Sequence, residues 1–144
     1  MRLLIFLSLL FAGPAAIAAE YRSIGDNAVP MYDAPSAKAN KLFVASRLYP
    51  VELIVQLDSW AKVRDAAGDL AWVEKKNLSD MRMVVVTAAL AEVRQKAEDG
   101  ALLVFQARQG VTLEIVELGM DPWVKVRHRD GQTGFVRTSQ VWGR

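Results

Sequence analysis

Residues 60–73 read W-A-K-V-R-D-A-A-G-D-L-A-W-V, and residues 123–136 read W-V-K-V-R-H-R-D-G-Q-T-G-F-V. The two stretches share the frame W-x-K-V-R-x-x-x-G-x-x-x-aromatic-V at a constant offset of 63 residues. An internal repeat of this length indicates one small structural unit that is used twice in tandem. The repeat therefore favours a binding module over an enzyme.

Alternation of apolar and polar residues with a period of two predicts that each unit is built from β-strands. The expected strands are residues 51–57, 61–64, 70–73, 84–86, 111–116, 124–128 and 134–137. Residues 88–97 have helical propensity, but they match a strand-and-loop region of the first copy, so we expect a strand there. A short 3₁₀ turn is expected to close each copy, at residues 77–79 and 139–141.

Turn residues and chain length add two expectations. Asp130-Gly131 predicts a two-residue hairpin turn in which both residues have positive φ, and Ala67-Gly68-Asp69 is its counterpart in the first copy. Pro50-Val51 aligns with Gly110-Val111 at an offset of 60. Upstream of this turn, residues 31–35 and 42–43 align with residues 93–97 and 104–105 at an offset of 62. The second copy is therefore expected to be two residues shorter in the turn and three residues longer in the loop at 119–122, since length changes are usually confined to turns.

The start of the chain has the pattern of a secretory signal peptide. Arg2 is followed by about ten apolar residues, the breaker Gly13-Pro14 and a run of small residues. A membrane span needs about 20 apolar residues, so an uncleaved anchor is the weaker alternative. We expect cleavage after Ala18 or Ala19. The expected organisation is a signal peptide and two repeats, at residues 1–19, 20–81 and 82–144.

Composition limits the classes of function. The 144-residue chain has 18 Lys and Arg against 16 Asp and Glu, and the expected signal peptide removes only Arg2. A nearly neutral protein gives no basis for nucleic-acid binding. The chain has no Cys, which excludes disulfides, a thiol nucleophile and a cysteine-linked lipid anchor. We expect a periplasmic or secreted protein, from a Gram-negative bacterium, without a membrane anchor after cleavage.

These residues resemble the bacterial Src-homology-3-like domain. The resemblance rests on the loop Y-D-A-P-S (Tyr32–Ser36), the strand G-V-T-L-E-I-V (Gly110–Val116) and the W-x-K-V-R and G-F-V strands. It covers both copies and implies an all-β fold of two tandem small five-stranded, partly open barrels. It also implies a non-catalytic role in cell-wall targeting or in binding peptides and partner proteins. The second copy lacks the Y-D-A-P-S loop, having Arg94–Ala97 instead, so the copies need not share a ligand.

Strand alternation sorts the repeated residues onto two faces. Ala61 and Val63 are expected to face the core, and Trp60 then shares the outer face with Lys62. Trp123 repeats the position of Trp60. An outward tryptophan is unusual enough that something is expected to cover it.

Two interpretations of the outward tryptophans are open. In the first, Trp60 forms a groove with Tyr32 and Tyr49 that receives an extended peptide or a sugar face. In the second, each tryptophan stacks under its own loop or on the stems of neighbouring Arg and Lys side chains.

Further aromatic and basic residues have similar alternatives. Trp72 and Phe135 are expected to pack across a strand or to cover a barrel end, and Trp142 is expected to pack locally or to link the two domains. The basic residues of copy two form either a patch for anionic polymers or a solvated face with acids nearby; they are Lys125, Arg127, Arg129 and Arg137. The candidate ligand-binding residues are Tyr32, Tyr49, Trp60, Trp72, Trp123 and Phe135.

Catalysis has little support in the sequence. His128 is the only histidine, and alternation places it half-buried near a hairpin tip. One His without any Cys does not make a zinc site of the usual kind, and no G-x-S-x-G turn is present. We therefore expect no enzymatic activity, no metal and no cofactor.

The sequence thus predicts a non-catalytic adaptor of the bacterial envelope. Its expected partner is a peptide, either a peptidoglycan stem peptide or a segment of an envelope protein. The alternative is a structural scaffold in which the two barrels dock on each other, with Trp60 and Trp123 buried at their junction. The oligomeric state is open.

Overall fold

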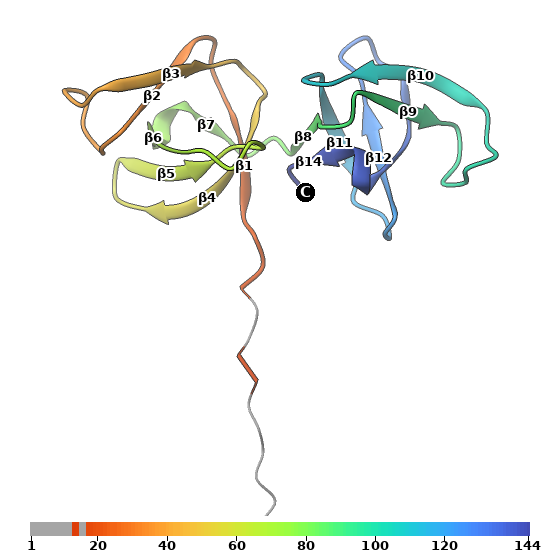
Figure 1. Ribbon diagram of the computed structural model, residues 1–144, viewed down its shortest axis with the longest axis horizontal. Helices are drawn as coiled ribbons and strands as arrows, with labels where there is room; N and C mark the ends of the chain where they lie inside the picture. Colours follow the sequence, from red (N-terminus) through yellow and green to blue (C-terminus); the bar gives the residue numbers. More distant parts are fainter. Residues whose placement is uncertain (1–12, 15–16) are drawn as a thin grey trace, which may run out of the picture.

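The computed structural model describes residues 13–14 and 17–144 and contains two copies of one all-β unit (Figure 1). The predicted signal peptide falls mainly on residues 1–12 and 15–16, outside the described residues. Copy one contains β1 (Tyr21–Ile24), β2 (Val29–Tyr32), β3 (Lys41–Ala45), β4 (Pro50–Gln56), β5 (Trp60–Arg64), β6 (Leu70–Glu74), the 3₁₀ turn η1 (Lys75–Asn77) and β7 (Leu78–Ser79). Copy two contains β8 (Met83–Val86), β9 (Leu90–Arg94), β10 (Leu103–Arg108), β11 (Thr112–Glu117), β12 (Trp123–Arg127), β13 (Thr133–Arg137), η2 (Thr138–Gln140) and β14 (Val141–Trp142).

Each copy is a single antiparallel sheet that curls into a partly open barrel. The strand order is β3-β2-β6-β5-β4-β1-β7 in copy one and β10-β9-β13-β12-β11-β8-β14 in copy two. The predicted fold class of two tandem Src-homology-3-like barrels is confirmed. Each sheet has seven strands where five were expected, because the sheet includes short strands such as the two-residue β7 and β14.

Each barrel has its own core, built by the predicted alternation. Ala61 and Val63 are 0% and 2% exposed in copy one. Val124 and Val126, on β12, are both 0% exposed in copy two. The buried residues form two separate clusters, one per copy, so each barrel has a core of its own.

The strand register shows that the two copies are more alike than the sequence alignment predicted. Ser23 pairs with Pro50, and Val85 pairs with Thr112. The offset between the copies is therefore 62 through this turn, and the predicted offset of 60 is wrong. The hairpin loop before Trp123 is one residue longer than the loop before Trp60, which changes the offset to 63. The predicted shortening by two and lengthening by three residues is replaced by this single insertion.

The predicted two-residue turn at Asp130-Gly131 is also wrong. Gly131 has φ 96°, but Asp130 is not among the non-glycine residues with positive φ. The N–H of Gly131 donates to the carbonyl of His128 at 2.9 Å, and the N–H of His128 donates to the carbonyl of Gln132 at 2.8 Å. This is a three-residue loop closed by a glycine bulge, so only the glycine needs the left-handed conformation.

Other elements follow the prediction closely. Residues 88–97 contain the strand β9 and no α-helix, because the tertiary position overrides the local propensity. A 3₁₀ turn closes each copy as expected, but it lies at Lys75–Asn77 instead of 77–79 and at Thr138–Gln140 instead of 139–141. In the part of the chain that the structure describes, no helix has the length and hydropathy of a membrane span.

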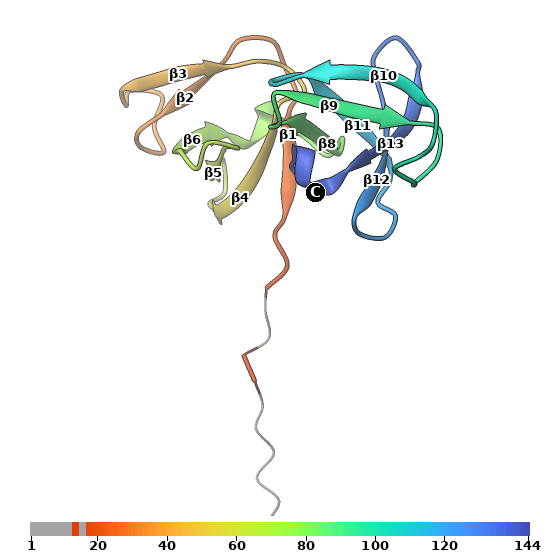
Figure 2. The same cartoon turned by 45° about the vertical axis from the view of Figure 1, so that its right-hand side comes forward.

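The two barrels meet along β1, β8 and β14, which lie between them in both views (Figures 1 and 2). Tyr21 of copy one meets Trp142 of copy two edge to face, with ring centroids 5.3 Å apart. The guanidinium of Arg82 lies over the Tyr21 ring at 5.7 Å. Burial, and secondarily the charge of Glu52, raise the pKa of the Tyr21 hydroxyl. Trp142 thus links the two domains, as one of its two interpretations predicted.

Candidate functional site

Copy one carries a cluster of aromatic side chains on its outer surface, which we call the aromatic face; it consists of Tyr32, Trp60 and Trp72. Tyr32 and Trp60 meet edge to face, with centroids 5.4 Å apart and an interplanar angle of 82°. Tyr32 is the Cα partner of Trp72, and Trp72 is also the partner of Lys62. Partners in a ladder share a face, so the four side chains lie on one side of the sheet.

The aromatic face is only partly covered. Tyr32 is 5% exposed, whereas Trp60, Lys62 and Trp72 are half-buried. Glu74 lies opposite Trp60 on β6 and is also half-buried. Tyr32 therefore acts as a buried wall against which the accessible indole of Trp60 is held. The aromatic face also has one cationic and one anionic side chain beside it, Lys62 and Glu74.

The equivalent surface of copy two, which we call the capped face, consists of Arg94, Trp123, Phe135 and Arg137. Arg94 pairs with Phe135 as Tyr32 pairs with Trp72. The guanidinium of Arg137 lies 4.8 Å from the ring centroid of Trp123, which is 8% exposed. The ammonium of Lys125 lies 5.7 Å from the ring centroid of Phe135. The tryptophan expected to point outward is thus covered by an arginine, as the second interpretation predicted.

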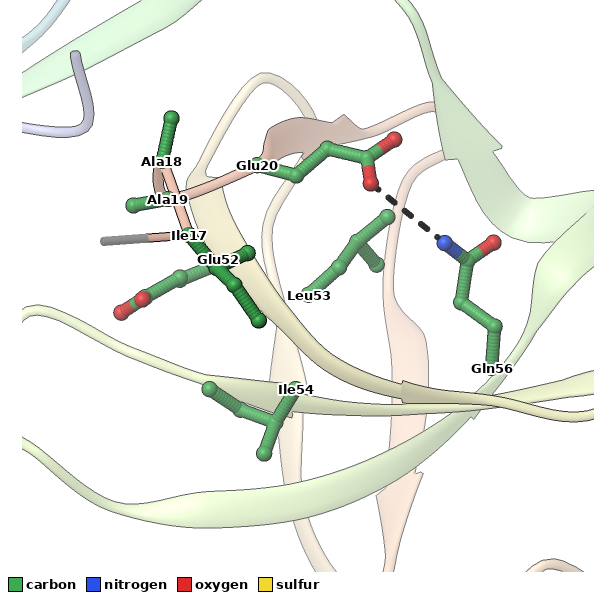
Figure 3. Close-up of a pocket in the computed structure, with 8 residues that line it drawn as sticks. All are labelled: Ile17, Ala18, Ala19, Glu20, Glu52, Leu53, Ile54 and Gln56. Carbon is green, nitrogen blue, oxygen red and sulfur yellow. Dashed lines mark hydrogen bonds between the residues drawn. The ribbon is translucent and has the colours of Figure 1, made fainter. Parts of the chain in front are cut away.

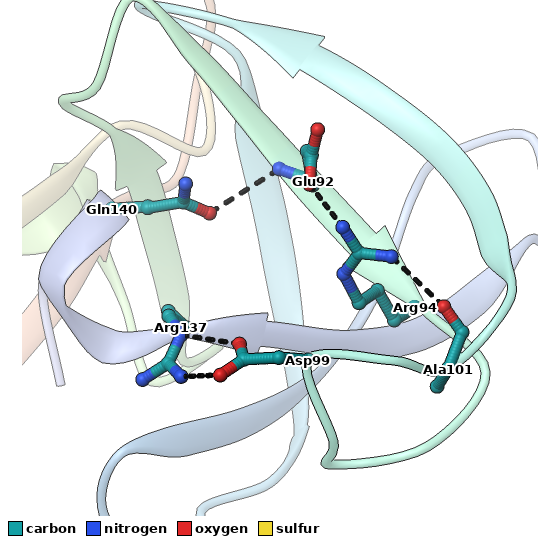
Figure 4. Close-up of polar contacts among 6 residues, drawn as sticks. All are labelled: Glu92, Arg94, Asp99, Ala101, Arg137 and Gln140. Carbon is teal, nitrogen blue, oxygen red and sulfur yellow. Dashed lines mark hydrogen bonds and ion pairs between the residues drawn. The ribbon is translucent and has the colours of Figure 1, made fainter.

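Ion pairs hold this cover in place (Figure 4). The Nε of Arg137 donates to Oδ1 of Asp99 at 2.9 Å, and its Nη2 contacts the other carboxylate oxygen. This hydrogen bond lowers the pKa of the Asp99 carboxyl. Arg94 pairs with Glu92 and donates to the carbonyl of Ala101 at 2.8 Å. A space of about 170 Å³ remains between these side chains and Trp123.

Glu92 and Asp99 contribute to the capped face although no sequence pattern singled them out. The signal is a comparison of the copies at the offset of 62, which places Pro30 opposite Glu92 and Ala37 opposite Asp99. The loop backbones are the same, because Asp33 N–H donates to Asn40 O at 3.1 Å and Gln95 N–H donates to Leu102 O at 2.9 Å. Charges that occur on one copy of a shared backbone mark a difference in the surface and not in the fold.

Tyr49 does not join the aromatic face. It packs against the core of copy one and lines a space of about 290 Å³ at the junction, together with Val85, Val86 and Gly110 of copy two. Burial raises the pKa of its hydroxyl. The structure therefore brings together Tyr32, Trp60 and Trp72, places Trp123 and Phe135 on the capped face, and leaves Tyr49 at the junction.

The basic residues of copy two are mostly paired. The guanidinium of Arg127 makes two hydrogen bonds of 3.1 Å to Glu114, which raise the pKa of this arginine. Arg137 is paired with Asp99. Lys125 lies over Phe135. For these three residues, a solvated face with nearby acids describes the surface better than a single patch.

A cavity of about 310 Å³ lies against β4 (Figure 3). It is lined by Glu52, Leu53, Ile54 and Gln56 on one side and by Ile17–Glu20 on the other. The amide of Gln56 donates to Glu20 Oε2 at 3.5 Å across it. Three of these lining residues belong to the segment expected to be removed with the signal peptide, so this cavity is not a candidate site.

Residues with chemical reactivity are sparse. His128 is half-buried, its ring lies 5.7 Å from that of Phe105, and its Nδ1 lies 3.1 Å from Asp130 Oδ1. The pKa of the Asp130 carboxyl is lowered mainly by a hydrogen bond from the backbone N–H of Gln132, and to a smaller extent by His128. Among the described residues, no group of three or more His, Asp or Glu side chains is placed to hold a metal ion.

Comparison with known proteins identifies both copies with one family. Residues 25–80 and 87–143 each match the family described as bacterial SH3 domain. A comparison with curated proteins found no match. Among solved structures, NlpC1 from Trichomonas vaginalis is 14% identical, with a TM-score of 0.41 over 96% of this chain and 51% of that chain. NlpC2 from the same organism is 12% identical, with a TM-score of 0.41 over 88% and 49%.

This chain spans about half the length of those two proteins. The family match, by contrast, covers most of the chain, in two tandem segments with the same strand order. The protein belongs to the bacterial SH3 domain family, a family of binding modules.

Proposed function

We propose that this protein is a non-catalytic, exported binding or adaptor protein of the bacterial envelope, and that copy one recognises an extended peptide through its aromatic face. The observation that carries the proposal is the edge-to-face contact of Trp60 with Tyr32 at 5.4 Å. This contact holds a partly exposed indole in one orientation. A rigid aromatic side chain offers a large contact area at a low cost in conformational entropy.

The proposed ligand is a peptidoglycan stem peptide or a segment of another envelope protein. Export is supported by the signal-peptide pattern of residues 1–19. Lys62 lies beside the aromatic residues, so a carboxylate of the peptide would find a partner there, whereas Glu74 is already paired with Lys76 at 3.1 Å. Electrostatic complementarity of this kind would contribute more to specificity than to affinity.

The proposal assigns different roles to the other candidate residues. Trp123 and Phe135 lie under Arg137 and Lys125, so copy two would bind the same peptide only after its cover moves. Tyr49 lines the junction between the barrels. Peptide recognition is therefore assigned to Tyr32, Trp60 and Trp72.

Binding to purified peptidoglycan sacculi, measured by co-sedimentation, tests the proposal. We expect Trp60→Ala to lower the bound fraction about tenfold or more, because a central aromatic residue of an interface contributes about 2 kcal/mol. The control is Leu102→Ala, which removes a side chain that is 71% exposed in copy two, outside the aromatic face. The control should bind as the unaltered protein does. Unchanged binding by Trp60→Ala and Trp123→Ala, to sacculi and to extracted envelope proteins, would refute the groove.

A structural scaffold is the second candidate, and the contact of Tyr21 with Trp142 favours it. Its expectation that Trp60 and Trp123 are buried at the junction is wrong, because Trp60 contacts Tyr32 and Trp123 lies under Arg137, each within its own copy. In a scaffold the fixed relation of the two barrels would matter, and no peptide would occupy the aromatic face. Small-angle scattering of Trp142→Ala would reveal a loosened junction. If that variant loses its biological role while Trp60→Ala keeps it, the scaffold is the better description.

A further inference from the structure

A cavity of about 360 Å³ lies between the two copies and is lined by residues of both. Copy one contributes Arg47 and Leu48 from the turn between β3 and β4. The connecting segment and β8 contribute Met81 and Met83. Arg129 lies on the opposite side, in the hairpin loop between β12 and β13. None of these residues belongs to the aromatic face.

The floor of this cavity is apolar. Met83 is 4% exposed and Met81 is 45% exposed, and Leu48 is half-buried. Methionine side chains adapt to ligands of different shape because they are unbranched and flexible. The floor therefore suits a short apolar group.

The rim of the cavity is cationic. The charged lining residues are Arg47, Arg127, Arg129 and a single acid, Glu114. Arg127 is bound to Glu114 by two hydrogen bonds of 3.1 Å. In the described part of the chain, neither Arg47 nor Arg129 forms a salt bridge, and both are exposed. Two guanidinium groups are thus available to an anion, and a guanidinium binds carboxylate and phosphate well.

The backbone of Leu48 is an independent sign that this cavity is used. Leu48 has φ 70°, in the left-handed region that costs a branched residue free energy. Its counterpart in copy two is Gly110, with φ 90°. The N–H of Leu48 donates to Ile24 O at 2.8 Å, as the N–H of Gly110 donates to Val86 O at 2.9 Å. Glycine is therefore sufficient to form this turn. A leucine at this position is less favourable for the backbone, and its side chain lines the cavity.

From these observations we infer that the cavity between the copies binds a small amphiphilic anion, a single carboxylate or phosphate joined to a short apolar group. The anionic group lies between Arg47 and Arg129. The apolar group rests on Leu48, Met81 and Met83. This site is separate from the aromatic face, so it can be occupied while a peptide is bound there.

The test is a titration of the full protein followed by NMR of the backbone amides of Leu48, Met83 and Gly131. The probes are N-acetylleucine, its uncharged amide N-acetylleucinamide, butyl phosphate and inorganic phosphate. We expect N-acetylleucine or butyl phosphate to shift these resonances in a saturable way. N-acetylleucinamide should bind at least about tenfold more weakly, because it lacks the charge that the arginines bind. The stronger of the two anions identifies a carboxylate or a phosphate as the natural group.

Variants separate the two halves of the site. Arg129→Gln should lower the affinity for the anionic probes about tenfold. The control is Arg108→Gln, which changes an exposed arginine on β10 outside this cavity and should leave the affinity unchanged. Leu48→Gly should fold normally, since Gly110 occupies the same position in copy two. This variant should lower the affinity for the probes that carry an apolar group, N-acetylleucine and butyl phosphate. The inference is overturned if no probe shifts these resonances, or if N-acetylleucinamide binds as tightly as the tighter of the two anions, N-acetylleucine or butyl phosphate. It is also overturned if inorganic phosphate binds as well as butyl phosphate, or if Leu48→Gly keeps full affinity.

Discussion

The outer face of copy one and the outer face of copy two share a backbone but have different surfaces. In copy one a buried tyrosine supports a partly exposed tryptophan. In copy two the corresponding tryptophan is 8% exposed beneath an arginine. The difference arises at four pairs of positions: Pro30 and Glu92, Tyr32 and Arg94, Ala37 and Asp99, and Glu74 and Arg137.

The two copies share the features that maintain the fold and differ in the side chains of one outer face. Both copies keep the ion pair between β4 and β5 or between β11 and β12, Glu52 with Arg64 and Glu114 with Arg127. Both keep the glycine of the hairpin loop, Gly68 and Gly131, with φ 90° and 96°. The shared features lie in the core and the turns, and the differing ones lie on one outer face. A duplicated domain can therefore change its binding properties without changing its fold.

The largest expected effect concerns the two tryptophans. Trp123→Ala should lower the free energy of unfolding by about 3–5 kcal/mol, because it removes a large buried side chain. Trp60→Ala should cost about 1–2 kcal/mol, since part of this side chain is already exposed. Urea unfolding of the two variants measures both values. Equal costs would mean that the two faces are packed alike, and the comparison would fail.

The next largest effect on stability is expected on β6 and β13, at the equivalent positions Ala71 and Gly134. Gly134 corresponds to Ala71, and a Cβ at Gly134 would lie 2.7 Å from the carbonyl oxygen of Arg94. Gly134→Ala should therefore cost about 1–3 kcal/mol through overpacking. The reciprocal change, Ala71→Gly, should cost about 1 kcal/mol. A neutral Gly134→Ala in thermal unfolding would show that β13 can move away from β9 and that copy two is not packed more closely there.

A smaller effect is expected when the cover is transferred to copy one. The double variant Ala37→Asp and Glu74→Arg creates, beside Trp60, a pair equivalent to Asp99 and Arg137 of copy two. An exposed pair of this kind changes stability by about 0.2–1 kcal/mol, but it should lower the solvent exposure of Trp60. 5-Fluorotryptophan NMR, with resonances assigned by single Trp→Phe variants, reads this exposure from the solvent isotope shift. The single variant Ala37→Asp is the control, because it provides no arginine to cover the indole.

The repeat and the strand alternation were sufficient to predict two all-β units in tandem, and the resemblance to the bacterial Src-homology-3-like domain implied that each unit is a small barrel. Ala61 and Val63 were correctly placed in the core, because period-two alternation is a direct consequence of strand geometry. The offset error at Pro50-Val51 arose because Leu48 and Gly110 occupy the same left-handed position. A leucine is a poor sequence signal for that conformation, so the alignment of the turn could not be read from residue types.

The surfaces were harder to predict because they depend on contacts between distant residues. Alternation placed Trp123 on the outer face, but its cover comes from Arg137 on the next strand and Asp99 in a separate loop. One of the two interpretations placed Tyr49 in a groove with Trp60, yet Tyr49 lies at the junction. Trp142 was correctly considered as a link between the domains, and Tyr21 is its partner. Residue type alone does not indicate which aromatic side chains meet.

The smallest expected effect is the pH dependence of the capped face. The hydrogen bond from Arg137 lowers the pKa of Asp99, so this pKa is below its value of about 3.9 in the unfolded chain. A group with a depressed pKa stabilises the fold above its unfolded pKa and loses that contribution as the pH falls through its folded pKa. The cover should therefore be intact at neutral pH and should loosen below about pH 4.

The fluorine resonance of Trp123 should report this loosening as a rise in solvent exposure on acidification. Asp99→Asn should show a more exposed Trp123 at neutral pH and a smaller change at low pH, because its amide does not titrate in this range. Trp60 serves as the internal control, since Ala37 occupies the place of Asp99 in copy one. An identical acid response of Trp123 in Asp99→Asn would assign the effect to other carboxylates. In that case Asp99 would not hold the cover, and the difference between the two faces would depend on the stacking of Arg137 on the indole together with those other carboxylates.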